Sequence, residues 1–466
     1  MPKCLTDNMR PTRLSELALE QSVDDLQRIA NKPIERLVAN DNVTLLAFPQ
    51  SFKLGLDDID KNCILYLDGE GLSTGNIMGF VGVNDTMLTI KSRFAKNDEE
   101  DYFLHYMLMR VFHFNLTNLK HSVSSESVFD LLLFVFPFFL KKAFRQGVYK
   151  KYRRYEYNDS NIRGPIDVSR HIRENVPFRG TVAYSTRMHS YDNEVTELIR
   201  HTIEFIKCRP LGRIVLGSDA ETKSAVSALV QATPSYNVKD RNRIVNCNLR
   251  PVNHPYYSEY TELQQICVRI LRYESIKFGQ DKNQIYGVLF DGAWLWEEYL
   301  DTILSSSNLG ITHAKNKEGI NGIQLYEGGG KYFPDFYHKT GVAENSFVLD
   351  AKYKRLGFDL TVDGQDDKKT NTISIGRDDL FQMITYMHVL PARHCALLYP
   401  IERNDDNSNG IILSASRKLL GDGGEIMGIG IPIVESANFV DFCDKQKNME
   451  SKLVEEVKIW LGNSSD

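Results

Sequence analysis

The sequence predicts a multidomain α+β or α/β protein. With 466 residues the chain is too long for one compact core, so two or three domains are expected. The hydrophobic pattern also changes along the chain. Short β-type runs fill residues 43–94, helical spacing dominates residues 192–272, and strands and helices mix after residue 331. The predicted parts are a β-rich amino-terminal domain with a leading helix, a mainly helical middle and a mixed carboxy-terminal domain, at residues 1–115, 116–270 and 271–466.

Composition excludes several classes of protein. Hydrophobic residues make up 42% and charged residues 25%, which is ordinary for a soluble globular protein. The net charge of −5 excludes a globally basic nucleic-acid binder, so any DNA contact must come from a local patch or from a partner. The seven cysteines form no C-x-x-C pair, which disfavours a zinc ribbon and fits reduced thiols in the cytoplasm. No signal peptide is expected, and the most apolar stretch, residues 128–140, is too short to span a bilayer.

The amino-terminal third contains the first predicted elements. Residues 1–45 have spacing typical of polar helices, and residues 43–94 contain short strands separated by Gly, Asp and Asn. Residues 100–155 again indicate helices, with residues 128–140 as a buried one. We therefore expect a leading helix, a small β-rich domain and a helical segment in that order.

Basic and aromatic residues alternate between residues 141 and 157. This pattern suits contact with phosphates and stacking on bases. It equally suits a solvated helix whose tyrosines face inward, and both interpretations stay open. The predicted DNA-binding residues are Lys150, Lys151, Arg153 and Arg154.

The middle of the chain is predicted to be helical. Gly164-Pro165 indicates a turn, after which Asp167 or Ser169 caps a helix. Residues 192–272 and 288–304 have the spacing of further helices, the last with tryptophan and tyrosine on its apolar positions.

The pattern that carries chemistry lies between residues 331 and 386. The apolar run 347–349 predicts a strand that ends on Asp350, and Lys352 points to the same side of that strand. Asp335 follows a proline and precedes this strand by the distance expected for a hairpin. Residues 377–389 have helical spacing, which places Gln382 and Tyr386 on one face.

This layout suits metal-dependent hydrolysis of phosphodiesters. The carboxylates of Asp335 and Asp350, with the main-chain carbonyl of Ala351, can hold a hard divalent cation such as Mg²⁺. Such an ion polarises a phosphate and lowers the pKa of bound water. Lys352 would stabilise the developing negative charge or orient the attacking water. The alternative is an ordinary hairpin with a solvated Asp/Lys edge.

These residues resemble those of a known family. The pattern P-D, D-A-K, Q-x-x-x-Y is similar to that of PD-(D/E)xK nucleases. The strings FVLDAKYK, LFQMITYM and ALLYP (residues 347–354, 380–387 and 396–400) resemble McrC, the nuclease subunit of modification-dependent McrBC restriction systems. The likeness extends upstream to residues 162–172 and 192–194.

The resemblance implies more than the spacing does. It implies a mixed sheet flanked by helices, Mg²⁺ with Mn²⁺ as an alternative, and a first helix that supplies a third acid, Glu297 with Glu298 as its rival. It assigns Gln382 and Tyr386 to orienting DNA or the shell of the site. It also implies an amino-terminal region that engages an McrB-type AAA+ GTPase, methylated or otherwise modified DNA, and a second copy for cutting both strands.

No G-x-x-x-x-G-K-[ST] motif occurs in the chain, so nucleotide hydrolysis would need another subunit. Two alternatives stay open. One is a free-standing RecB-like nuclease of the same superfamily. The other is a docking and activating subunit that does not cleave.

Overall fold

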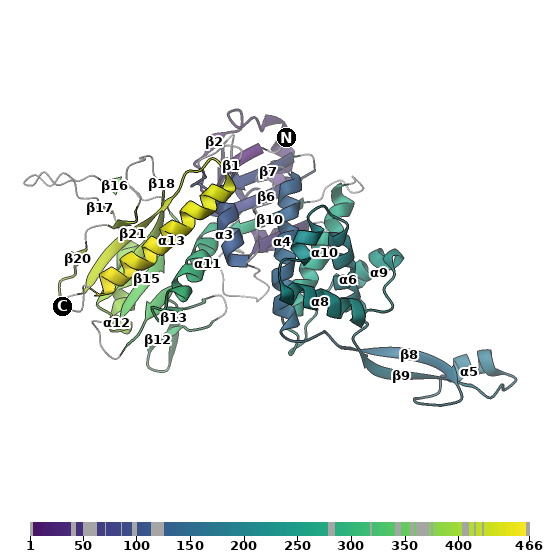
Figure 1. Cartoon of the computed structure of the whole chain (residues 1–466). Helices are drawn as coiled ribbons and strands as arrows, with labels where there is room; N and C mark the ends of the chain where they lie inside the picture. Colours follow the sequence, from purple (N-terminus) through teal and green to yellow (C-terminus); the bar gives the residue numbers. More distant parts are fainter. Residues whose placement is uncertain are drawn as a thin grey trace, which may run out of the picture. The chain divides into compact units, whose positions relative to one another are not determined.

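The computed structural model divides into two compact units, coloured along the chain in Figure 1. Unit 1 comprises Met1–Val128 and Asn283–Asp466, and unit 2 comprises Phe129–Lys282. The structure describes residues 3–38, 43–49, 63–69, 71–84, 86–95, 100–112, 125–277, 285–316, 319–340, 346–354, 358–359, 372–373, 376–402, 410–413, 416–421 and 424–462.

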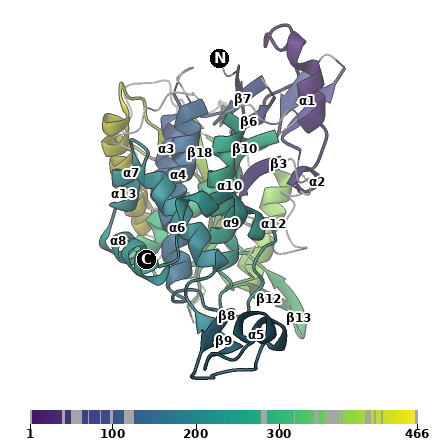
Figure 2. The same cartoon turned by 90° about the vertical axis from the view of Figure 1, so that its right-hand side faces the viewer.

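The first sheet of unit 1 joins two distant parts of the chain. Its strand order is β1-β7-β6-β10-β3, and Figure 2 shows β7, β6 and β10 side by side. The strands are β1 (Lys3–Thr6), β3 (Val43–Phe48), β6 (Ile77–Val83), β7 (Thr86–Lys91) and β10 (Ile285–Asp291). β10 runs antiparallel to β6 and parallel to β3. The predicted domain boundary at residue 271 separates β10 from this sheet. In the structure, β10 pairs with β6 and β3 of the amino-terminal segment.

A smaller sheet and short helices cover this part of unit 1. They are β2 (Thr12–Arg13), η1 (Glu20–Ser22), α1 (Val23–Ile29), α2 (Ile34–Val38), β4 (Leu65–Asp68) and β5 (Gly71–Thr74). Leu26, Ile29 and Leu72 are buried in the same core as Leu5 of β1. The expectation of a helical segment over residues 1–45 is therefore wrong for β1 and β2, because pairing with β7 and β5 outweighs local helical spacing.

Three helices of unit 1 meet around a buried carboxylate. They are α3 (Tyr102–Phe112), α11 (Gly292–Leu304) and α13 (Phe439–Gly462). The hydroxyls of Tyr106 and Tyr299 donate to Glu450 Oε1 at 2.8 and 3.0 Å. The helix predicted for residues 288–304 begins only at Gly292, where Asp291 accepts hydrogen bonds from the first turn. Residues 288–291 belong to β10, because they pair with β6 and the apolar side chains of Val288, Leu289 and Phe290 are buried.

The second sheet of unit 1 mixes parallel and antiparallel strands. Its order is β11-β14-β15-β18-β21-β19, and β20 also pairs with β21. The strands are β11 (Thr312–His313), β14 (Phe336–His338), β15 (Phe347–Ala351), β18 (His394–Glu402), β19 (Ile412–Leu413), β20 (Arg417–Lys418) and β21 (Glu425–Ile433). β15, β18 and β21 are parallel, whereas β14 and β15 form an antiparallel pair. The predicted mixture of strands and helices is confirmed here.

The helix α12 (Arg377–Val389) covers one face of this sheet, with the bounds that the sequence predicted. Its Met383 and Met387 belong to one buried cluster with Val348 of β15. Because side chains alternate along a strand, Asp350 points to the same face as Val348. Two hairpins complete unit 1: β12 (Ile323–Tyr326) with β13 (Gly329–Tyr332), and β16 (Phe358–Asp359) with β17 (Thr372–Ile373).

Unit 2 is mainly helical, as predicted. Its helices are α4 (Ser125–Phe144), which begins in unit 1, α6 (Glu194–Lys207), α7 (Gly212–Leu216), α8 (Ala220–Ala232), η3 (Val238–Asp240), α9 (Arg241–Cys247) and α10 (Tyr260–Lys277). Asn193 caps α6 by accepting hydrogen bonds from Val195 and Thr196. Leu133 to Phe136 of α4 are buried. None of the helices in the described part of the chain has the length and apolar character needed to cross a membrane.

A long two-stranded hairpin projects from the helices of unit 2 (Figure 1). It consists of β8 (Lys151–Asp159) and β9 (Val182–Ser190), with α5 (Val168–Asn175) in the connection between them. Asp167 Oδ1 accepts from Arg170 N at 3.1 Å, so the predicted cap is confirmed. The prediction of helix through residue 155 is wrong after Phe144, where α4 ends, and from Lys151 onward the residues pair with β9.

Candidate active site

Two acidic side chains meet where β14 and β15 pair. Asp335 directly precedes β14, and Asp350 is the fourth residue of β15. Phe336 pairs with Leu349, so the antiparallel register brings the two aspartates opposite one another. The amide of Ala351 donates to Asp335 Oδ2 at 2.7 Å, and Asp350 is only 1% exposed. The predicted hairpin therefore brings both carboxylates to one place.

The electrostatics of this pair favour a bound cation. Burial raises the pKa of Asp335 well above its usual value, and the charges of Asp350 and Glu297 raise it further. Burial also raises the pKa of Asp350, although the ammonium of Lys352 opposes that shift. Desolvated carboxylates that repel each other are stabilised as anions when they share a metal ion.

Lys352 lies beside the carboxylates, as strand alternation predicted. Its Nζ is 2.5 Å from Asp350 Oδ2 and donates to Gln382 Oε1 at 3.0 Å. Desolvation lowers the pKa of Lys352, but the charges of Asp350, Asp335 and Asp379 outweigh it, so the pKa is raised. The side chain therefore keeps its positive charge within the site.

Gln382 and Tyr386 extend this network along α12. Gln382 Nε2 donates to Tyr386 Oη at 3.0 Å, and Tyr386 Oη lies 3.5 Å from the carbonyl of Phe333. The spacing of four residues on one helix face thus places both side chains next to Lys352. A continuous chain of contacts runs from Asp350 through Lys352 and Gln382 to Tyr386.

The structure distinguishes the two glutamates that the sequence left open. The charge of Glu297 on α11 contributes to the raised pKa of both Asp335 and Asp350. Glu298 instead pairs with Lys315, whose Nζ lies 3.2 Å from Glu298 Oε2. Glu297 is therefore the glutamate of α11 whose charge acts on both aspartates.

These donors fit a divalent cation. Asp335 and Asp350 offer carboxylate oxygens, and Glu297 is a third acid near both of them. Mg²⁺ and Mn²⁺ prefer such oxygen ligands. The amide of Ala351 is bonded to Asp335, and its predicted role as a carbonyl ligand stays a prediction.

A comparison with models of protein families identifies the family of this chain. Residues 72–400, more than half of the chain, match the family described as "McrBC 5-methylcytosine restriction system component". The chain belongs to this McrBC family.

Solved McrBC structures show remote similarity. A chain in the half-complex from the tetradecameric assembly of Thermococcus gammatolerans McrB AAA+ hexamers with bound McrC has 14% identity and a TM-score of 0.49, covering 96% of this chain and 100% of its own. A chain in the cryo-EM structure of the Thermococcus gammatolerans McrBC complex has 13% identity and a TM-score of 0.33. The match covers 66% of the present chain and 88% of the chain in that complex. A comparison with curated protein sequences finds no match.

The sequence did not predict two residues that lie at the candidate site of this McrBC family member. Asp379 Oδ1 lies 3.9 Å from Lys352 Nζ, and its other oxygen pairs with Lys354. Its position three residues before Gln382 was a usable signal, because both occupy one helix face. His313 contacts Glu297, but its short strand, distant in sequence, carries no pattern that would have identified it.

The predicted DNA-binding residues lie in unit 2, where acids neutralise most of them. Lys151 pairs with Glu194 at 3.3 Å, and Arg153 lies 3.6 Å from Asp192. Arg154 lies 3.5 Å from an oxygen of Asp167. The exposed Lys150 sits over the ring of Tyr191. Contact with DNA stays a prediction for these four residues.

Proposed function

We propose that this chain is the nuclease subunit of an McrBC-type restriction system and hydrolyses DNA phosphodiesters with a divalent metal. The observation that carries the proposal is the meeting of Asp335, Asp350 and Lys352 at the ends of adjacent strands. Two carboxylates with raised pKa values and one retained ammonium form a site for a cation and a phosphate. An ordinary solvated hairpin edge would not bury Asp350 to 1% exposure.

Each side chain has a defined task in this proposal. Asp335, Asp350 and Glu297 hold Mg²⁺ or Mn²⁺, together with the carbonyl of Ala351. The ion, when bound, polarises the scissile phosphate and lowers the pKa of a bound water. Lys352 provides positive charge where negative charge develops on the phosphate.

The α12 residues position Lys352 in this proposal. Gln382 accepts from Lys352 and donates to Tyr386, so the ammonium is held before DNA arrives. A charge that is already oriented stabilises the transition state more than a mobile charge does, because no reorganisation is needed during the reaction.

The proposed partner is a GTP-hydrolysing AAA+ protein of the McrB type. The solved assemblies of Thermococcus gammatolerans contain McrB AAA+ hexamers with bound McrC, and the present sequence has no phosphate-binding loop of its own. The family description names 5-methylcytosine, so modified DNA is the proposed substrate. Two copies of the chain would cut the two strands.

The β8–β9 hairpin presents a surface that suits this partner. Exposed apolar side chains gather on α5 and the loops that flank it: Ile162, Ile166, Val168, Ile172, Val176 and Phe178. We call this set the α5 patch. Clustered exposed apolar side chains mark protein contacts more often than isolated ones. The α5 patch is a second proposed docking surface, in addition to the amino-terminal region.

A plasmid-cleavage assay tests the proposal. Wild type, Asp350→Asn and the control Asp378→Asn would be incubated with Mg²⁺, with and without the GTPase and GTP, on methylated and unmethylated DNA. Asp378 is exposed in the first turn of α12, so its variant should behave as wild type. We expect cleavage of methylated DNA only with partner and GTP, lost in Asp350→Asn.

The other outcomes favour the alternatives. Cleavage by wild type without the partner would favour a free-standing RecB-like nuclease. Faster GTP hydrolysis by the partner without cleavage under any condition would favour a docking and activating subunit.

A further inference from the structure

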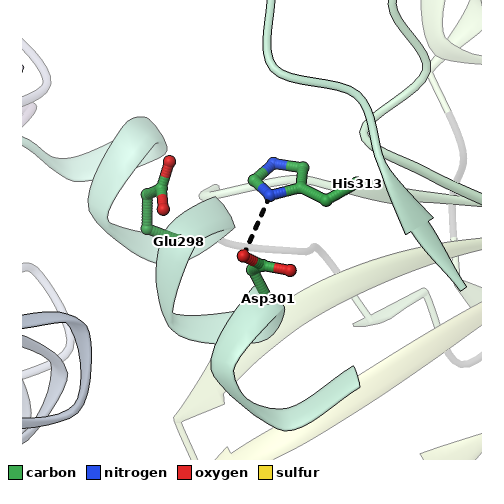
Figure 3. A group of neighbouring side chains, drawn as sticks. All are labelled: Glu298, Asp301 and His313. Atoms are coloured by element: carbon green, nitrogen blue, oxygen red, sulfur yellow. Dashed lines mark ion pairs between the residues drawn. The ribbon is translucent and has the colours of Figure 1, made fainter. Parts of the chain in front are cut away.

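His313 lies between two acids of α11, and its ring is almost fully enclosed. His313 Nε2 is 2.8 Å from Glu297 Oε1, and Nδ1 is 3.2 Å from Asp301 Oδ2. The side chain is only 5% exposed. Figure 3 shows the ring beside α11, with the dashed line running to Asp301. Because the two acids are four residues apart, they lie on one face of the helix, and each contacts one nitrogen of the ring.

The contact of His313 with Glu297 has hydrogen-bond geometry, and the contact with Asp301 is an ion-pair contact. Each nitrogen faces a carboxylate oxygen, and both nitrogens can donate only when the imidazole is protonated. Because its acceptor is a carboxylate, the hydrogen bond to Glu297 is charge-assisted, which makes it stronger and more directional than a neutral hydrogen bond.

A metal centre at His313 is the competing interpretation. Glu298, Asp301 and His313 offer ligand atoms within 4.8 Å of one another. However, the structure gives these side chains ion-pair partners, because His313 lies 2.8 Å from Glu297 and 3.2 Å from Asp301. Glu298 is engaged by Lys315 at 3.2 Å. The group is therefore an ion-pair network.

The strand that carries His313 also fixes Asp335. His313 pairs with Phe336 in the β11–β14 ladder, and the two rings lie 4.9 Å apart. The next amide, that of Ala314, donates to the carbonyl of Asp335 at 3.0 Å. One short strand thus determines the positions of Glu297 and Asp335 together.

We propose that His313 is a positioning residue that holds the Glu297 carboxylate toward Asp335 and Asp350, so that Glu297 completes the cation site. The inference rests on the proposed function, since it needs a cation at the aspartate pair. Asp301 anchors the far side of the ring. Groups that orient metal ligands typically change metal affinity by about 10–100-fold when removed.

Isothermal titration calorimetry of the chain with Mn²⁺ tests this role, because it measures metal affinity and does not depend on cleavage. The variants are His313→Asn, His313→Gln, Glu297→Gln and the control Glu298→Gln. A glutamine amide reaches about as far as Nε2 and keeps a donor to Glu297, whereas an asparagine amide reaches only as far as Nδ1. Circular dichroism would check that each variant is folded.

We expect His313→Asn to weaken Mn²⁺ binding by about tenfold or more, and His313→Gln to restore most of that loss. Glu297→Gln should weaken binding at least as much, and adding His313→Asn to it should cost little more, because both changes remove one interaction. Glu298→Gln should bind as wild type.

Four results would overturn the inference. If Glu297→Gln weakens binding but His313→Asn does not, Glu297 needs no positioning and the proposed function survives. If the asparagine and glutamine variants lose binding equally, the role is only structural. If His313→Asn and Glu298→Gln each remove one bound Mn²⁺, a separate metal site exists. If wild type binds no Mn²⁺, the proposed metal-dependent function fails as well.

Discussion

Tyr353 Oη lies 2.7 Å from Ser92 Oγ, although the two residues are 261 positions apart. Tyr353 follows Lys352 directly, and Ser92 follows the last residue of β7, so the candidate active site is joined to the amino-terminal sheet. Both side chains are buried. The guanidinium of Arg93 lies over the Tyr353 ring at 5.0 Å and pairs with Asp7, which ties the strand ends together.

Replacing Tyr353 with phenylalanine should destabilise unit 1. The ring stays in place, but Ser92 loses a buried hydrogen-bond partner, which costs about 1 kcal/mol of unfolding free energy. Denaturant unfolding followed by tyrosine and tryptophan fluorescence would measure it. Tyr326→Phe is the control, because Tyr326 is exposed and should change stability by less than about 0.5 kcal/mol. Equal stability of the two variants would contradict the prediction.

Lys352→Met should abolish most cleavage and leave the fold intact. It retains the aliphatic stem and removes the charge, which should lower the single-turnover rate by about 10²-fold or more at saturating Mg²⁺. Gln382→Leu should lower the rate less, by about 10-fold, because Lys352 keeps its charge and loses only its orientation. A Lys352→Met enzyme as fast as wild type would remove this residue from the mechanism.

His201 should make unit 2 sensitive to acid. The side chain is 1% exposed, and within the described part of the chain neither ring nitrogen has a hydrogen-bond partner. Burial lowers its pKa to about 4, and nearby arginines also lower it. The folded state thus favours the neutral ring, so stability is present above about pH 6.5, the ordinary value for histidine, and is lost as pH falls through about 4.

Hydrogen exchange of the α6 amides, corrected for intrinsic rates, would measure this loss. Each unit of pKa corresponds to about 1.36 kcal/mol, so wild type should lose a few kcal/mol of protection between pH 7 and 4. His201→Leu should lose clearly less, because leucine takes up no proton. The same pH dependence in both proteins would show that other groups are responsible.

Charged substitutions in the α5 patch should weaken the proposed association with the GTPase. Ile172→Asp and Phe178→Asp place a carboxylate where an apolar contact is expected, and each should reduce the association constant by about 10-fold or more. Co-sedimentation and stimulated GTP hydrolysis would measure the effect. Ser224→Asp adds the same charge at an exposed position of α8 in the same unit and should bind normally. Normal binding by both patch variants would place the docking surface elsewhere.

Several features followed from the sequence because local periodicity decides them. The strand that carries Asp350, the helix from Arg377 to Val389 and the shared face of Gln382 and Tyr386 depend on repeats of two and of 3.6 residues, although the strand ends at Ala351 and not at Asp350 as predicted. Near neighbours impose these repeats on the chain. The helical character of residues 192–272 followed for the same reason.

Other features were decided only by the tertiary structure. β10 completes the amino-terminal sheet, residues 151–159 form a strand, the charge of Glu297 acts on both aspartates, and His313 contacts Glu297. Each depends on contacts between segments that are distant in the sequence, such as β10 with β6 or His313 with α11. Local spacing contains no information about which distant edge or charge will become a partner, so only the folded chain determines these pairings.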